Sequence, residues 1–219
     1  GCTGSGIISV AREFVENGDF EAGNDGSFSS GYLYIPDGAG NSELVADNDN
    51  RGYSITTDGN NVHNNFWGFD HTTGSGNFMA INGHDNITIW EQTIDVLPNT
   101  NYYFSAWARS LNAAGPFAKL VFTINGIEIG SQLDLTARLN DSDPAHDNWK
   151  RFYGNWMSGP STNSVVLAIK NKEPSHGGND FAIDDISFAS LSTFITLNTT
   201  PETQSQEVCI NSPVDQIIY

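Results

Sequence analysis

Apolar residues in this sequence come in short runs, and no long stretch keeps the period of an amphipathic helix. Many runs alternate apolar and polar residues, as strands with one buried face do, and glycine, asparagine, aspartate and proline separate them. The clearest runs lie at residues 11–16, 77–82, 87–97, 101–110, 117–125, 149–157, 164–170 and 180–188. This spacing predicts an all-β fold, a two-sheet antiparallel β-sandwich arranged as a jelly roll.

The amino-acid composition changes near residue 190, and this change sets the predicted domain boundary. After it, serine, threonine and glutamine dominate before a strand pattern resumes. We expect a disordered or linker N-terminus over 1–10, a jelly-roll module over 11–190, and a linker with the start of a following β repeat over 191–219. The long polar stretches at 22–41, 47–65 and 138–148 are predicted to be loops.

Acidic residues outnumber basic ones by far, with 26 Asp and Glu against 9 Lys and Arg and a formal net charge of −17 over 219 residues. Such a chain repels nucleic acid and anionic membrane surfaces, so neither is an expected partner. No apolar run approaches the length of a membrane span, so no membrane insertion is expected. Cys2 and Cys209 lie at opposite ends of the chain, and the sequence leaves open whether they pair.

Motifs for catalysis are missing from the sequence. It contains no G-x-S-x-G elbow and no H-E-x-x-H pair, and neither cysteine has the neighbours of a zinc ligand. Two of the many carboxylates could still converge across a cleft, as they do in glycosidases. We therefore expect a protein that is not an enzyme, and a polysaccharide-active enzyme remains the third reading of its function.

Three acidic segments adjoin predicted strands, and the last of them places two aspartates inside the run from Phe181 to Phe188. The apolar phase changes across this pair, which predicts a β-bulge that re-aims both carboxylates. In a jelly roll the first and last strands commonly lie side by side, so these segments can meet. Calcium takes six to eight oxygen ligands. Candidate calcium ligands are Asp19, Glu21, Asp70, Asp184 and Asp185. The alternative is a bulge whose carboxylates are satisfied by backbone N–H groups or solvent without an ion.

Aromatic residues provide a candidate binding surface on two predicted strands. Strict alternation turns Tyr103, Trp107 and Arg109 to the face opposite the core in the run 101–110, and turns Tyr153 outward in the run 149–157. Aromatic rings stack against the C–H faces of sugars while polar side chains bind the hydroxyl groups. If the two strands share a sheet, this face is a glycan-binding cleft. The alternative is that a long loop covers Trp107 and makes it part of a minor core.

The segments "NGDFEAG", "DHTTGSGNFM" and "FAIDDISF", together with "PNTNYYFSAWARS", resemble signatures of extracellular MAM-type jelly rolls. Over about residues 12–189 the chain is even more similar to the jelly-roll modules, related to carbohydrate-binding modules and galactose-binding-like domains, of Bacteroidetes surface proteins. The resemblance implies a structural calcium held by Glu21, Asp70 and Asp184 or Asp185. The cysteines usual in MAM domains are absent, so the resemblance carries over only the fold and the ion.

The tail "SQEVCINSPVDQIIY" resembles the opening of repeats in bacterial gliding and adhesion proteins that leave the cell by type IX secretion. Together the two resemblances imply a calcium-stabilised adhesin module, secreted and displayed on the cell surface, that binds a glycan or surface polysaccharide. Other surface proteins are possible partners. The second reading is an architectural or protein-binding module without a sugar site.

Overall fold

The computed structural model describes residues 10–38, 44, 52–84, 87–138, 149–175 and 177–192. The chain divides into two compact units, one spanning Glu13–Ser190 and the other made of its two ends, Gly1–Arg12 with Leu191–Tyr219. The predicted linker over 1–10, apart from Val10, and both cysteines lie outside the described residues. So do the predicted loop at 138–148, apart from Arg138, and the predicted repeat beyond Ser192.

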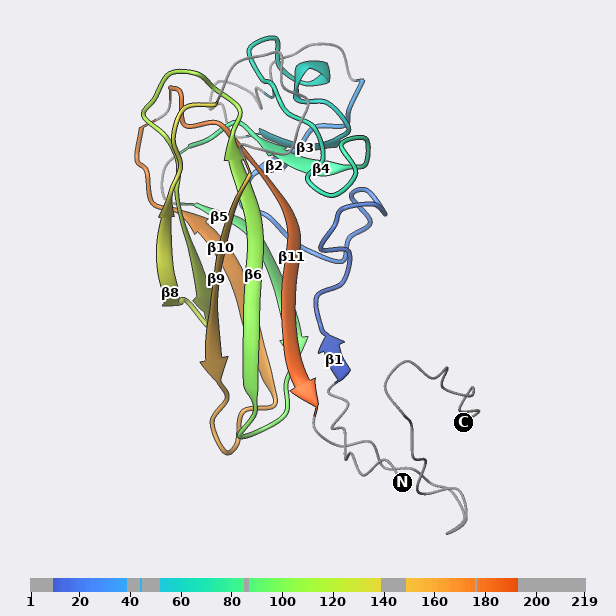
Figure 1. Ribbon diagram of the computed structural model, residues 1–219, viewed down its shortest axis with the longest axis vertical. Coiled ribbons are helices and arrows are strands. Elements are labelled where there is room, and N and C mark those ends of the chain that lie inside the picture. The colour runs from blue at the N-terminus through green and yellow to red at the C-terminus, as the bar shows by residue number, and fades with distance from the viewer. Residues whose placement is uncertain are drawn as a thin grey trace, which may run out of the picture. The chain divides into compact units, whose positions relative to one another are not determined.

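Two β-sheets pack face to face in the unit Glu13–Ser190, which confirms the predicted all-β sandwich (Figure 1). The larger sheet has the strand order β2-β3-β4-β11-β6-β9, and β1 pairs with β11 beside this path. Its strands are β1 (Val10–Glu13), β2 (Leu33–Tyr34), β3 (Gly52–Thr56), β4 (Phe78–Ile81), β6 (Asn101–Ser110), β9 (Lys150–Met157) and β11 (Phe181–Ser192). The smaller sheet has the order β5-β10-β7-β8, formed by β5 (Thr88–Asp95), β7 (Lys119–Ile124), β8 (Ile127–Asp134) and β10 (Ser164–Asn171).

The main core lies between the two sheets and follows the alternation that the sequence predicts. In β6, Tyr102, Phe104, Ala106 and Ala108 point inward and are buried. The ring of Phe122 in β7 meets Phe104 edge to face, with ring centroids 4.7 Å apart. Full burial of each such side chain contributes about 1.5–3 kcal/mol to stability, so this interface fixes which faces of the sheets turn outward.

Three strands were not expected from the sequence, and two of them correct predicted loops. β2 lies within the stretch 22–41, β3 lies within the stretch 47–65, and β8 follows the Asn125–Gly126 turn. All of β3 is buried, because Tyr53 and Ile55 face the main core while Ser54 faces the opposite side of the sheet. A strand buried on both faces loses the polar alternation by which strands are recognised.

A second, smaller core covers part of the outer face of the larger sheet. Val62 and Phe66, from the segment between β3 and β4, pack against Phe78 and Ala80 of β4. Leu44, Leu111, Trp149 and Ala182 complete the buried cluster. The segment 57–77 is therefore not a solvated loop but a cover over one part of the sheet. No helix in the described part of the chain is long and apolar enough to cross a membrane.

Candidate functional site

A β-bulge in β11 sets the position of the paired aspartates. β11 pairs with β6 in register through Asp184, and the register shifts before it resumes at Ser187. Within the bulge Asp185 has a φ of 47°, in the left-handed region. This confirms the bulge predicted from the change of apolar phase. The bulge lies where β11 has finished pairing with β4, whose register ends at Ile183. The backbone N–H of Ile186 instead donates to the carbonyl of Gly18, 2.9 Å away.

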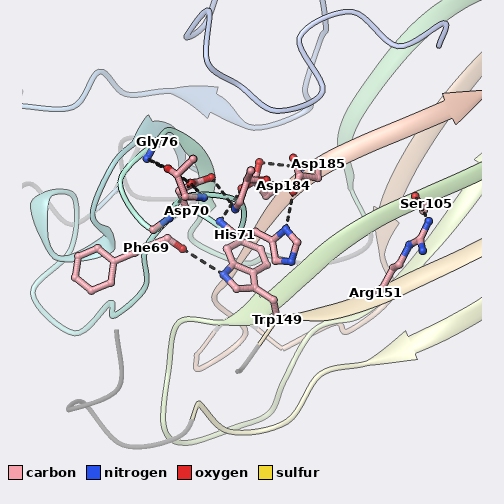
Figure 2. A network of polar contacts seen from close by, with 12 residues as sticks. Phe69, Asp70, His71, Gly76, Ser105, Trp149, Arg151, Asp184 and Asp185 are labelled. Carbon is pink, nitrogen blue, oxygen red and sulfur yellow. Dashed lines mark hydrogen bonds and ion pairs between the residues drawn. The ribbon is translucent and has the colours of Figure 1, made fainter. Parts of the chain in front are cut away.

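Asp184 and Asp70 form a buried carboxyl pair at this bulge (Figure 2). Their side chains are 0% and 3% exposed and share a hydrogen bond. Burial, and after it the hydrogen bond to Asp70, raises the pKa of Asp184 to about 9. Burial also acts to raise the pKa of Asp70, but hydrogen bonds from Thr73 and the bond with Asp184 outweigh it and hold that pKa below its usual range. Two buried carboxyls in contact require either a shared proton or a cation.

The backbone of the segment after Asp70 wraps around its carboxylate. Oδ2 of Asp70 accepts hydrogen bonds from the backbone N–H groups of Thr73, Gly74 and Gly76, at 2.6, 3.0 and 3.3 Å. A Cβ at Gly76 would lie 2.1 Å from Oε1 of Glu21 and 3.1 Å from Oδ2 of Asp70, so it would require the carboxylate of Glu21 to move. Oε1 of Glu21 and Oδ2 of Asp70 therefore both lie close to Gly76, and Asp184 contacts Asp70 from β11. The signal that could have identified the wrapping turn is the run "TTGSG" after Asp70 and His71.

The two other predicted metal ligands do not join this group. Oδ2 of Asp185 contacts Nδ1 of His71 at 2.5 Å and accepts a hydrogen bond from Thr72 Oγ1 at 2.7 Å. Asp19 is exposed, and its Oδ1 accepts a hydrogen bond from the backbone of Glu21 at 3.3 Å. In the described residues, no three His, Cys, Asp or Glu side chains already stand in a metal-binding arrangement.

The donor set nevertheless suits a hard cation. Asp70 and Asp184 are buried oxygen donors in contact. The exposed carboxylate of Glu21, whose Oε1 accepts a hydrogen bond from the backbone N–H of Asn77 at 2.8 Å, lies beside Asp70 and could supply a further oxygen. A cation bound between these carboxylates would also offset their mutual repulsion. Without a cation, one of the two buried carboxyls must be protonated to avoid that repulsion. Asp19 and Asp185 do not fit as ligands without leaving their present partners.

Trp107 and Arg109 lie under the cover formed by segment 57–77, which corrects their predicted place on an open surface. The ring of His71 stacks on Trp107 at 4.0 Å between centroids, and Trp107 is half-buried against the smaller core. Arg109 is 7% exposed, with its guanidinium 5.9 Å from the ring centre of Trp149. Trp149 is fixed in turn by a hydrogen bond from Nε1 to the carbonyl of Phe69, at 3.3 Å. The alternative reading, a minor core around Trp107, is the correct one.

Tyr103 and Tyr153 remain open to solvent on the same face of the sheet. β6 and β9 are antiparallel neighbours, with Tyr103 opposite Asn155 and Ser105 opposite Tyr153. The two tyrosines are 49% and 68% exposed. They occupy diagonal positions, roughly 7 to 8 Å apart in such a ladder, so both rings can contact one ligand. We call the outward side chains of Tyr103, Ser105, Arg151, Tyr153 and Asn155 the tyrosine face.

Arg151 supplies hydrogen-bond donors on the tyrosine face. Its Nη2 donates to Ser105 Oγ at 3.2 Å (Figure 2). Its guanidinium carbon lies 5.6 Å from the ring centre of Tyr153. Arg151 and Asn155 share the outward parity of Tyr153 in β9 but were not among the predicted binding residues. The predicted binding surface included Trp107, which lies at the covered end of the sheet. Only the tertiary structure distinguishes the solvent-exposed part of this sheet face from the part that segment 57–77 covers.

No protein-family model and no curated protein matches this sequence. Among solved structures, the chain is similar to a Stig cyclase from Fischerella sp. TAU, with 13% identity, a TM-score of 0.51, and coverage of 83% of this chain and 98% of the cyclase. It also aligns with the xylan-binding CBM22-1 domain of Paenibacillus barcinonensis Xyn10C, with 10% identity and a TM-score of 0.47 over 86% and 98% of the two chains. The module TmCBM61, solved with β-1,4-galactotriose, gives 14% identity and a TM-score of 0.48 over 81% and 97%. The cyclase shows that the β-sandwich fold is shared, and fold alone does not decide function.

Proposed function

We propose that this chain is a non-catalytic glycan-binding module whose ligand lies on the tyrosine face. The observation that carries the proposal is the pair of exposed rings, Tyr103 and Tyr153, on adjacent strands of a rigid sheet. Tyrosine offers an apolar ring face to sugar C–H groups, while Asn155 and Arg151 beside it can bind hydroxyl groups. Strands hold these side chains at fixed spacing, so little order has to be gained on binding.

A glycan array, followed by calorimetry on the best ligand, tests this proposal. Tyr103→Ala and Tyr153→Ala should each weaken binding by about 1–3 kcal/mol, the usual effect of removing a binding hot spot. Both rings are largely exposed, so unfolding should change little. Ile127→Ala is the matched control, because Ile127 is an exposed apolar residue on β8 of the other sheet. Unchanged binding in both tyrosine variants would refute the tyrosine face as the site.

A second function, contact with another protein, has one observation in its favour. Met157, at the end of β9, is exposed and points to the same side as Tyr153 and Asn155. An exposed methionine adapts to apolar protein surfaces and adds little to sugar binding. Loss of a partner on Met157→Ala, without loss of glycan affinity, would favour the protein-binding reading.

We also propose that calcium stabilises the module through Asp70, Asp184 and Glu21. The support is the contact of two buried carboxyls with a third carboxylate beside them. When bound, the ion would neutralise this charge and join the segment around Glu21 to β11 and to the turn after Asp70. A ligand that binds only the native state raises stability by mass action. Millimolar calcium should therefore raise the melting temperature, and chelator should lower it.

Two variants distinguish an ion from a shared proton at this pair. Asp184→Asn keeps the shape of a protonated acid but lacks the charge that holds calcium, so its melting temperature should not respond to the ion. Asp25→Asn, at an exposed turn, should respond like the wild type. If wild-type melting is the same in calcium and in chelator, the pair is held by a proton and the calcium proposal is wrong.

The cellular setting of this module is also a proposal. An extracellular, cell-surface adhesin suits a chain of net charge −17 whose one open aromatic pair, in the described residues, lies on a sheet face. A role in gliding motility and export by type IX secretion rests on the resemblance of the tail. Detection of the full-length protein on intact cells, with an antibody to this module, tests the location directly.

A further inference from the structure

The charges on the tyrosine face differ from those of the chain as a whole. Acidic residues outnumber basic ones by 26 to 9 in the sequence. On the outward positions of β6 and β9, however, there is no Asp or Glu, and the exposed charge is that of Arg151. The outward set consists of Asn101, Tyr103, Ser105, Trp107, Arg109, Arg151, Tyr153, Asn155 and Met157.

Arg151 has no carboxylate partner in the described part of the chain. Two lysines do have one: Lys119 lies 2.8 Å from Glu173, and Lys172 lies 2.9 Å from Glu128. Arg151 instead rests on Ser105 and beside the ring of Tyr153. These two contacts fix the direction of a guanidinium whose remaining N–H donors are open to a ligand.

The acids nearest to the tyrosine face along the sheet are occupied elsewhere. Glu13 accepts a hydrogen bond from Ser187 Oγ at 2.6 Å and another from the backbone N–H of Phe188 at 2.8 Å. Asp185 is held by His71 and Thr72. Neither makes an ion pair with Arg151, so within the described residues the face presents the positive charge of Arg151 beside the ring of Tyr153.

We propose, resting on the proposed glycan-binding function, that the tyrosine face selects glycans with an acidic group and that Arg151 binds this group. A guanidinium matches the planar oxygens of a carboxylate, and also those of a sulfate ester, with two parallel N–H donors. The rings of Tyr103 and Tyr153 then hold the neighbouring sugar faces. The negative charge of the chain acts against this ligand at long range and not at contact, because salt screens charges beyond about 8 Å at physiological ionic strength.

Calorimetry at physiological ionic strength, with two matched pairs of ligands, tests the proposal. The first pair is an oligogalacturonate and its carboxyl-reduced product of the same length. The second is a sulfated galactan oligosaccharide and its desulfated product. Wild type should bind the acidic member of one pair about tenfold or more tightly, the effect of one charge-assisted hydrogen bond. The pair that shows the preference identifies the acidic group as carboxylate or sulfate.

Three variants separate local recognition from net charge. Arg151→Gln should abolish the preference while neutral sugars still bind through the tyrosines. Arg151→Lys, which keeps the charge without the fork, should retain only part of it. Lys172→Gln changes the net charge by the same amount on the other sheet and should leave the preference intact.

The outcomes also distinguish this inference from the proposal on which it rests. If wild type binds the neutral members equally well, selection of acidic glycans is refuted. If Arg151→Gln keeps the preference, the assignment of Arg151 as the residue that binds the acidic group is refuted. In both cases the glycan-binding function stands. If no glycan of either kind binds to wild type, both are refuted.

Discussion

Asp180 carries an energetic penalty at neutral pH that a single substitution should remove. The side chain is buried immediately before the start of β11, where Oδ1 accepts a hydrogen bond from the backbone of Gly83 at 3.0 Å and Oδ2 contacts Nδ2 of Asn112. Burial raises its pKa from 3.8 to about 6, although both hydrogen bonds act to lower it. The neutral form is therefore favoured in the folded protein relative to the unfolded chain.

The sign and size of the effect follow from this difference in pKa. An acid whose pKa is higher in the folded state contributes stability below the unfolded value of 3.8, and that stability is lost as the pH rises through about 6. For each pH unit between these two pKa values, the unfolding free energy changes by about 1.4 kcal/mol. The whole interval therefore changes it by about 3 kcal/mol. In Asp180→Asn the side chain stays neutral, keeps an oxygen for Gly83, and needs only a turn of the Asn112 amide.

Urea unfolding at a series of pH values measures this prediction. The unfolding free energy of Asp180→Asn minus that of wild type should rise between pH 4 and pH 6 by up to about 3 kcal/mol and then stay constant. At neutral pH this corresponds to a melting temperature higher by roughly 5 to 10 °C. Asp95→Asn, an exposed position on β5, is the matched control and should show no such rise. A difference that is the same at pH 4 and pH 7 would refute the assigned penalty.

Three further substitutions probe the contacts described above. Gly76→Ala should abolish the calcium response, because the new Cβ would lie 2.1 Å from Oε1 of Glu21 and displace that carboxylate. An unchanged calcium response would argue against Glu21 as a ligand. Trp107→Ala should lower the unfolding free energy by about 2–4 kcal/mol and leave glycan affinity unchanged, since the ring packs under His71; a stable variant that binds glycan poorly would reverse this reading. Gln92→Leu should lower the unfolding free energy by about 2–4 kcal/mol in denaturant unfolding, because this buried amide makes two hydrogen bonds with the backbone of Glu16 and one with that of Ser27. An unchanged unfolding midpoint would contradict this prediction.

The sequence by itself determined the sandwich, the bulge and the direction of the side chains in β6 and β9. Alternation of period two fixes which residues share a face, so Tyr102 and Phe104 had to be buried if Tyr103 was to be exposed. The same rule locates the bulge, because one extra residue at the Asp184–Asp185 pair exchanges the faces of everything after it. These are local properties of a strand, and they hold wherever the strand is placed.

Only the tertiary structure decided which part of the outer face stays open. Tyr103, Trp107 and Arg109 have the same parity in β6, yet the cover formed by segment 57–77 lies over the last two and leaves the first exposed. That cover is held by Phe66 against Phe78 and Trp149, contacts between residues far apart in the sequence. The same holds for the acids: Asp184 turns toward Asp70 while Asp185 turns toward His71. A periodic sequence pattern shows which residues share a face of a strand. It does not show which segment packs on that face, because the packing joins residues that are far apart in the sequence.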